Sequence, residues 1–127
     1  MGLFSRWFGR DQDSGEDLPI TLDVEARRQQ LLQLETSLDA LANAMREHPQ
    51  LASNPGWQAR TAEYGRLAGE AMMLRKGQPD RESLLDLAFE VRPVFKEVPP
   101  GLEGLVGLQD AAMRAAESLV TVLPGER

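Results

Sequence analysis

The chain has 127 residues, of which 42% are hydrophobic and 27% charged, and its formal net charge is −6. This length suits a single domain, and the composition is that of a globular protein. With no cysteine and one histidine, the sequence excludes a disulfide framework, thiolate zinc sites, a cysteine nucleophile and a two-histidine metal site within one chain. Nucleic acid is a poor candidate partner, because phosphate contacts require clustered Lys and Arg.

The first ten residues, MGLFSRWFGR, form an amphipathic peptide with two arginines and no acid. Its large apolar side chains have the i, i+1, i+4, i+5 spacing of one helical face, and they are Leu3, Phe4, Trp7 and Phe8. Arg6 and Arg10 lie beside or opposite this face. Leaving such apolar side chains exposed costs about 1.5–3 kcal/mol each relative to burial, so we expect the peptide to find a binding surface.

Three surfaces suit this peptide. It can dock on the chain's own bundle (or stay disordered, as chain ends often are), insert into a groove on a protein partner or a neighbouring copy, or lie at a membrane surface, which favours aromatic and basic side chains. Its short length and two charges make membrane binding weak, and Arg6 replaces the Ser or Thr of the myristoylation motif. The pattern of a secretory signal is missing, so we expect a cytoplasmic protein, with membrane association as the alternative.

The composition then changes twice along the chain. Residues 11–20 are polar and acidic, with one glycine and one proline, which is typical of a linker. Residues 21–124 contain long runs of helical periodicity, separated by short segments with proline or glycine. We therefore expect three parts, which are the N-terminal peptide (residues 1–10), an acidic linker (11–20) and a helical bundle (21–124).

The first periodic run begins at Thr21 or Asp23, either of which can cap a helix, and a following proline stops it near Glu47. One buried face is predicted, formed by Val24, Leu31, Leu34, Leu38, Leu41 and Met45. Arg27 and Arg28 interrupt this face, so we expect the first turns of the helix to stand clear of the core.

The second run begins at Asn54 and Pro55, an N-cap followed by proline at the first helical position, and Gly77 ends it. Its apolar face comprises Trp57, Tyr64, Leu67, Ala68, Ala71 and Leu74. Gly65 and Gly69 lie inside the run, where each glycine costs about 1 kcal/mol relative to alanine. Their spacing favours close approach of a neighbouring helix.

The third run begins at Pro79 and Asp80, and Pro93 predicts either a kink or an end near Arg92. The residues in helical phase are Leu84, Leu87, Ala88, Val91, Phe95 and Val98. This run is therefore the one whose length the sequence leaves open.

The fourth run spans Leu102 to Leu123. Its main face comprises Leu105, Leu108, Ala112, Ala115, Leu119 and Val122, and Val106, Ala116, Val120 and Leu123 widen it. A surface helix needs an apolar stripe of about 100°, so the wider stripe indicates either a central helix or a face for a second copy. We expect a homodimer through this run or the N-terminal peptide.

No segment alternates apolar and polar residues over a useful length. Four helical runs joined by short loops predict an all-α fold, an antiparallel four-helix bundle whose third helix is kinked or ended near Pro93. We expect Leu38 and Leu108 to lie centrally in its core.

The sequence contains only weak candidates for catalytic or metal-binding residues. A histidine phosphotransfer site requires an exposed mid-helix histidine near lysine and glycine, whereas His48 lies in the sequence REHPQ at a predicted helix end, which favours a capping or surface role. Glu82, Asp86 and Glu90 form a row at spacing four that could hold Mg²⁺ together with waters. A solvated helix surface explains this row better, so we predict no cofactor and no catalytic residue.

The leading hypothesis is a non-enzymatic helical-bundle protein that acts through protein–protein interaction, as an adaptor or regulator. The N-terminal peptide is its recognition element, and the partner is a protein that the sequence does not identify. Two alternatives stay open: a peripheral membrane protein anchored by the same peptide, and a metal-dependent enzyme that uses the acid row.

Overall fold

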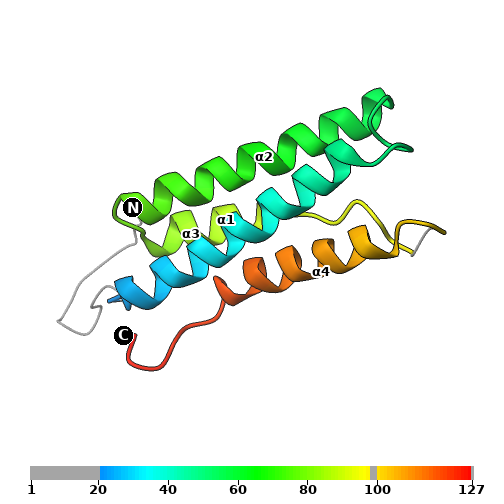
Figure 1. Cartoon of the computed structure of the whole chain (residues 1–127). Helices are drawn as coiled ribbons and strands as arrows, with labels where there is room; N and C mark the ends of the chain where they lie inside the picture. The colour runs from blue at the N-terminus through cyan, green and yellow to red at the C-terminus, as the bar shows by residue number, and fades with distance from the viewer. Residues whose placement is uncertain (1–20, 98–99, 127) are drawn as a thin grey trace.

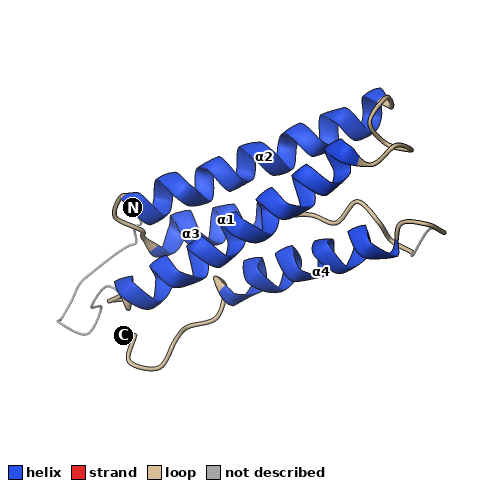
Figure 2. Ribbon diagram, in the orientation of Figure 1, coloured by secondary structure: helices blue, strands red, loops and turns tan. Residues whose placement is uncertain are grey.

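The computed structural model describes residues 21–97 and 100–126. These residues form four helices, α1 (Val24–Glu47), α2 (Pro55–Lys76), α3 (Arg81–Glu90) and α4 (Glu103–Ser118), and contain no strand. Successive helices run in opposite directions, and each packs against its neighbours in chain order, with α4 returning to α1 (Figure 1 and Figure 2). The fold is the all-α antiparallel four-helix bundle that the sequence predicts.

Side chains cap the first three helices where the sequence predicts. Asp23, Asn54 and Asp80 each accept a hydrogen bond of 2.8–3.1 Å from a backbone N–H in the first turn of α1, α2 and α3. Such N–H groups have no partner within the helix, so a cap stabilises the start. The C-cap of α2 is Gly77, whose N–H bonds back to the carbonyl of Met73, and that end also agrees with the prediction.

The core lies between α1, α2 and α4, and α3 closes it. It consists of Leu31, Leu34, Leu38, Leu41, Ala42 and Met45 from α1; Tyr64, Leu67, Ala68 and Ala71 from α2; Leu84, Leu87 and Ala88 from α3; Leu105, Ala112, Ala115 and Ala116 from α4; and Leu51, Val91, Phe95, Leu102 and Leu119 outside the helices. Leu38 is fully buried, as expected, whereas Leu108 is partly buried and packs at the margin. The central place predicted for Leu108 is wrong, because Gln109 faces inward on α4 instead.

α3 ends at Glu90, and a non-helical segment of residues 91–97 continues past it (Figure 2). This confirms the predicted end near Arg92, since Pro93 removes a helical N–H and disfavours helix in the residue before it. Val91 and Phe95 are buried as expected, but they reach the core from non-helical backbone. The helical phase predicted for Phe95 is therefore wrong.

Gln109 of α4 holds this non-helical segment. Its side-chain oxygen accepts hydrogen bonds from the N–H groups of Val94 and Phe95 at 2.6 and 2.8 Å, and its amide nitrogen donates to the carbonyl of Phe95 at 3.0 Å. The Tyr64 hydroxyl donates to the carbonyl of Arg92 at 2.6 Å, and burial raises the pKa of Tyr64. Side chains of α2 and α4 thus satisfy backbone groups that a longer α3 would have satisfied internally.

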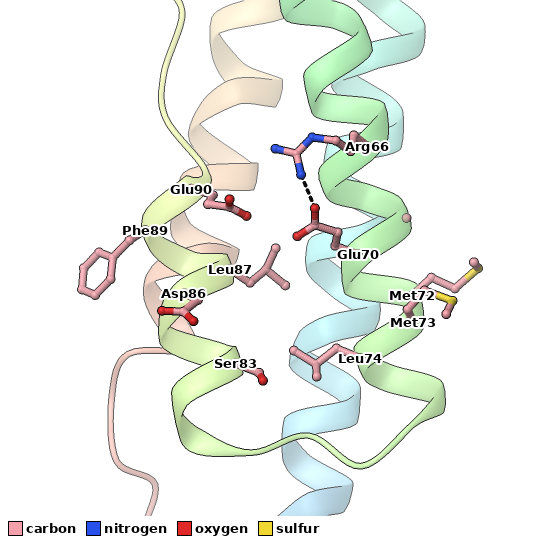
Figure 3. Close-up of a pocket in the computed structure, with 11 residues that line it drawn as sticks. Arg66, Glu70, Met72, Met73, Leu74, Ser83, Asp86, Leu87, Phe89 and Glu90 are labelled. Atoms are coloured by element: carbon pink, nitrogen blue, oxygen red, sulfur yellow. Dashed lines mark hydrogen bonds and ion pairs between the residues drawn. The ribbon is translucent and has the colours of Figure 1, made fainter. Parts of the chain in front are cut away.

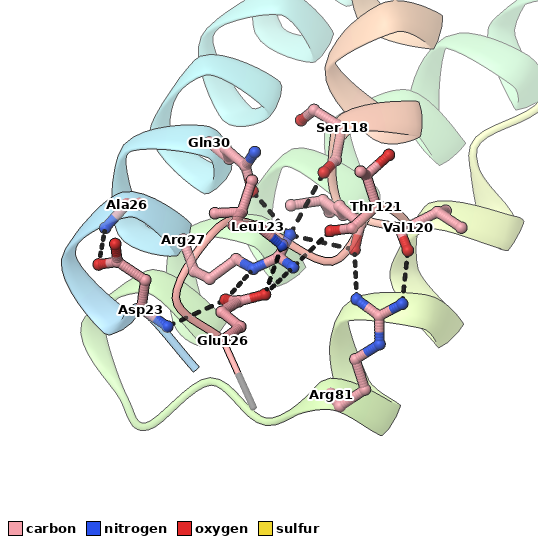
Figure 4. A network of polar contacts seen from close by, with 11 residues as sticks. Asp23, Ala26, Arg27, Gln30, Arg81, Ser118, Val120, Thr121, Leu123 and Glu126 are labelled. Atoms are coloured by element: carbon pink, nitrogen blue, oxygen red, sulfur yellow. Dashed lines mark hydrogen bonds and ion pairs between the residues drawn. The ribbon is translucent and has the colours of Figure 1, made fainter. Parts of the chain in front are cut away.

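Arg27, in the first turns of α1, is buried, contrary to the expectation drawn from it, although the apolar core begins only at Leu31. This side chain is 0% exposed and forms a two-point ion pair with Glu126, at 2.7 Å from Nη2 to Oε1 and 2.9 Å from Nε to Oε2 (Figure 4). Its remaining N–H groups donate to Gln30 and to carbonyls at the end of α4 and just beyond it. The segment after α4 folds back across the start of α1 and supplies the counter-ion.

α4 ends at Ser118 rather than near Leu123. Arg27 and Arg81 donate hydrogen bonds to the carbonyls of residues 118–121 (Figure 4), so side chains satisfy the groups that the helix leaves open at its end. Val120 and Val122 lie beyond the helix and are exposed. The widened stripe therefore includes residues outside α4, and the homodimer inferred from it stays a prediction.

Candidate protein-binding groove

A groove of about 910 Å³ lies between α2 and α3 (Figure 3). Its lining comes from both helices and comprises Arg66, Gly69, Glu70, Met72, Met73, Leu74, Ser83, Asp86, Leu87, Phe89 and Glu90. The groove is large enough to take several side chains of a bound segment, since pockets of about 300–1,000 Å³ enclose drug-sized ligands.

The groove combines an apolar floor with exposed apolar edges. Leu74 of α2 and Leu87 of α3 form the floor, where Leu87 is 3% exposed. Met73 projects from α2 and Phe89 from α3 at the outer edges (Figure 3). They are 69% and 65% exposed, the highest values among the exposed large hydrophobic residues that the structure describes. Exposed apolar side chains beside a groove make it a candidate interaction surface.

Carboxylates make this groove acidic. Glu70 of α2 and Glu90 of α3 face one another across it (Figure 3), and Asp86 lines the same side as Glu90. Arg66 pairs with Glu70 on α2. Burial raises the pKa of Glu70, and the nearby charge of Glu90 raises it further. Three carboxylates and one arginine line the groove.

The space beside Gly65 and Gly69 of α2 is open, and no neighbouring helix of the described bundle fills it. A Cβ atom added at Gly65 or at Gly69 would meet no other atom within 4 Å. The close helix approach expected from their spacing is therefore wrong. Gly69 lines the groove, where its missing side chain keeps the floor open.

The six residues predicted from the sequence to bind a partner or membrane lie outside the described residues; they are Leu3, Phe4, Arg6, Trp7, Phe8 and Arg10. Of the weak metal candidates, Asp86 and Glu90 line the groove and Glu82 does not. Within residues 21–97 and 100–126, no three His, Asp or Glu side chains come together in a way that could hold a metal ion.

His48 lies at the opposite end of the bundle from the start of α1. It is the C-cap residue of α1, and its Nδ1 accepts a hydrogen bond from the N–H of Gln50 at 3.2 Å. It also lines a second hollow of about 590 Å³ between α1 and the start of α4, beside Gly104 and Leu108. None of the strongly exposed large hydrophobic residues borders this hollow, so the α2/α3 groove is the stronger candidate for a binding surface.

Sequence reasoning missed the residues that make the groove distinctive. Met73 and Phe89 are large apolar residues that lie outside the predicted core faces of their helices. That mismatch is a usable signal, because an apolar residue out of phase points away from the core. It does not show that the two residues flank the same groove, which depends on how α2 and α3 pack.

The chain matches no protein-family model, and comparisons with curated proteins and with solved structures find no similar protein. In the part of the chain that the structure describes, no helix combines the length and apolar character needed to cross a membrane. A fold of this kind serves many functions, so the chemistry of the groove carries the functional argument.

Proposed function

We propose that the protein acts by binding other proteins, as an adaptor or regulator rather than an enzyme, with the α2/α3 groove as its contact surface. The observation that carries this proposal is the pair of exposed residues, Met73 and Phe89, on either side of an apolar floor. Methionine and aromatic side chains are enriched in protein interfaces, and methionine adapts its shape to different partners.

The groove suits an amphipathic helical segment of the partner. Leu74 and Leu87 offer an apolar floor for one helical face. The carboxylates of Glu70, Asp86 and Glu90 favour basic side chains beside that face, because complementary charge speeds association and fixes register. The N-terminal peptide of this chain has the same combination of features, an aromatic face and two arginines. We propose it as a recognition element for that reason.

The test is capture of proteins from a lysate of the source organism. The double variant Met73→Ser/Phe89→Ser removes both apolar edges, and Val120→Ser/Val122→Ser is the matched control on exposed residues elsewhere. We expect the wild-type chain and the control to retain the same proteins and the groove variant to lose them. Equal retention by all three would contradict the proposal.

Co-sedimentation with anionic liposomes separates this function from peripheral membrane attachment. The full chain and a chain that begins at Leu18 are compared. We expect both to stay in the supernatant at physiological salt. Pelleting of the full chain alone would show that residues 1–10 anchor the protein to lipid.

A further inference from the structure

We propose that the N-terminal peptide of this chain, residues 1–10, docks into the α2/α3 groove of the same molecule. The inference rests on the proposed function of the groove as a protein-binding surface, and it names one occupant. Three observations support it: the charges of the two parts, the reach of the connecting segment and the length of the groove.

The charges of the peptide and the groove are complementary. The groove has three carboxylates, from Glu70, Asp86 and Glu90, against the one guanidinium of Arg66. The peptide carries Arg6 and Arg10 and no acid. Docking brings the two arginines close to these carboxylates, and it covers apolar surface on both parts.

The connecting segment reaches the groove. Residues 11–20 span about 33 Å when extended. The start of α1 lies beside the end of α2, since Arg28 donates hydrogen bonds to the carbonyls of Arg75 and Gly77 at 3.1 Å. The groove begins at this end of the bundle, at Met73 and Ser83. A helix is about 10 Å wide, so the segment is long enough to pass around one and enter.

The groove and the peptide also match in length. On α3 the lining extends from Ser83 to Glu90, about 10 Å at 1.5 Å per residue. A helix from Leu3 to Arg10 has the same rise. Its four large apolar side chains then lie along the floor formed by Leu74 and Leu87.

Fluorescence of Trp7 tests the docking. The chain has two tryptophans, and Trp57→Phe leaves Trp7 as the only one while keeping an aromatic ring against Phe95. We expect Trp7 to emit at shorter wavelength, and to be quenched by acrylamide several-fold less, than in the free peptide of residues 1–10. Adding Met73→Ser/Phe89→Ser should expose Trp7, and adding Val120→Ser/Val122→Ser should not.

A charge swap gives the second arm. Asp86→Lys/Glu90→Lys should expose Trp7, and the further change Arg6→Glu/Arg10→Glu should protect it again. The control Asp39→Lys/Asp110→Lys makes the same charge change at exposed positions on α1 and α4, and we expect it to leave Trp7 protected. Helical circular dichroism of each variant verifies that the bundle is folded.

Each remaining outcome overturns the inference. If Trp7 is as exposed as in the free peptide, the peptide does not dock. If Trp7 stays protected in the groove variants, the peptide docks on another surface. Protection that disappears on dilution shows a second copy as the occupant. The proposed function is judged separately, because loss of captured proteins in Met73→Ser/Phe89→Ser supports it whether or not Trp7 is protected.

Discussion

The ion pair of Arg27 and Glu126 joins the two ends of the described bundle. Glu126 is 1% exposed, and its pKa is lowered to about 2, first by the hydrogen bonds from Arg27 and then by backbone N–H groups. Removing one partner of a buried pair leaves a buried charge and costs about 3 kcal/mol or more. We therefore expect Glu126→Gln to lower the free energy of unfolding by about that amount at pH 7, measured by urea denaturation. Glu117→Gln, at an exposed position, should change it by less than about 0.5 kcal/mol.

The same pair predicts a pH dependence with a definite sign. The pKa of Glu126 lies near 2 in the folded state and near 4.5 when unperturbed. A lowered pKa stabilises the fold at pH values above 4.5, and this stabilisation is lost as the pH falls toward 2. The stability difference between wild type and Glu126→Gln should therefore shrink between pH 5 and pH 2.5. A difference that stays constant over this range would show that the carboxylate charge is not what stabilises the contact.

Two glycines predict opposite effects of the same substitution. Gly65 lies inside α2 with open space at its Cβ position, whereas Gly101 has a φ of 86°. Gly65→Ala should raise the free energy of unfolding by about 0.5–1 kcal/mol, because alanine loses less backbone entropy in a helix. Gly101→Ala should lower it by about 1 kcal/mol, because a side chain is strained at positive φ. Denaturation midpoints test both expectations. If Gly65→Ala lowers the free energy of unfolding, a neighbouring helix packs closely against Gly65.

At the scale of elements, the non-helical segment 91–97 is held by the side chain of Gln109. Gln109 is 4% exposed and supplies the partners of two backbone N–H groups and one carbonyl. Gln109→Leu keeps the volume and leaves these groups without partners, at a cost of about 2–4 kcal/mol. We expect faster hydrogen exchange at the Val94 and Phe95 amides, with amides in the middle of α1 less affected. Unchanged exchange at these two amides would show that packing alone holds the segment.

The elements also show what sequence can predict here. Caps and prolines act on the residues next to them. Asp23 and Asn54 therefore predict where α1 and α2 begin, and Pro93 predicts where α3 ends, each to within a few residues. The burial of Arg27 depends on Glu126, which is 99 residues away, and no local pattern predicts that contact. No local pattern predicts the groove either, because the helical positions of Met73 and Phe89 show only that the two side chains point outward.

For the whole molecule, the bundle should fold without the N-terminal peptide and most of the linker. All the core residues of the described structure lie between Leu31 and Leu119. We expect a chain that begins at Leu18 to keep its helical circular dichroism and to melt within about 10 °C of the full chain, a range that corresponds to roughly 2–3 kcal/mol. Loss of helical signal would mean that the N-terminal residues belong to the core.

We propose the α2/α3 groove as the surface through which this protein makes contacts. Photo-crosslinking from a benzoylphenylalanine placed at Phe89 probes this surface, with the same residue placed at Val122 as the control, since both positions are exposed. In a lysate of the source organism, we expect discrete adducts from position 89, either within the chain to residues 1–10 or to another protein, and few from position 122. Equal yields from the two positions, or adducts from position 122 alone, would contradict the claim.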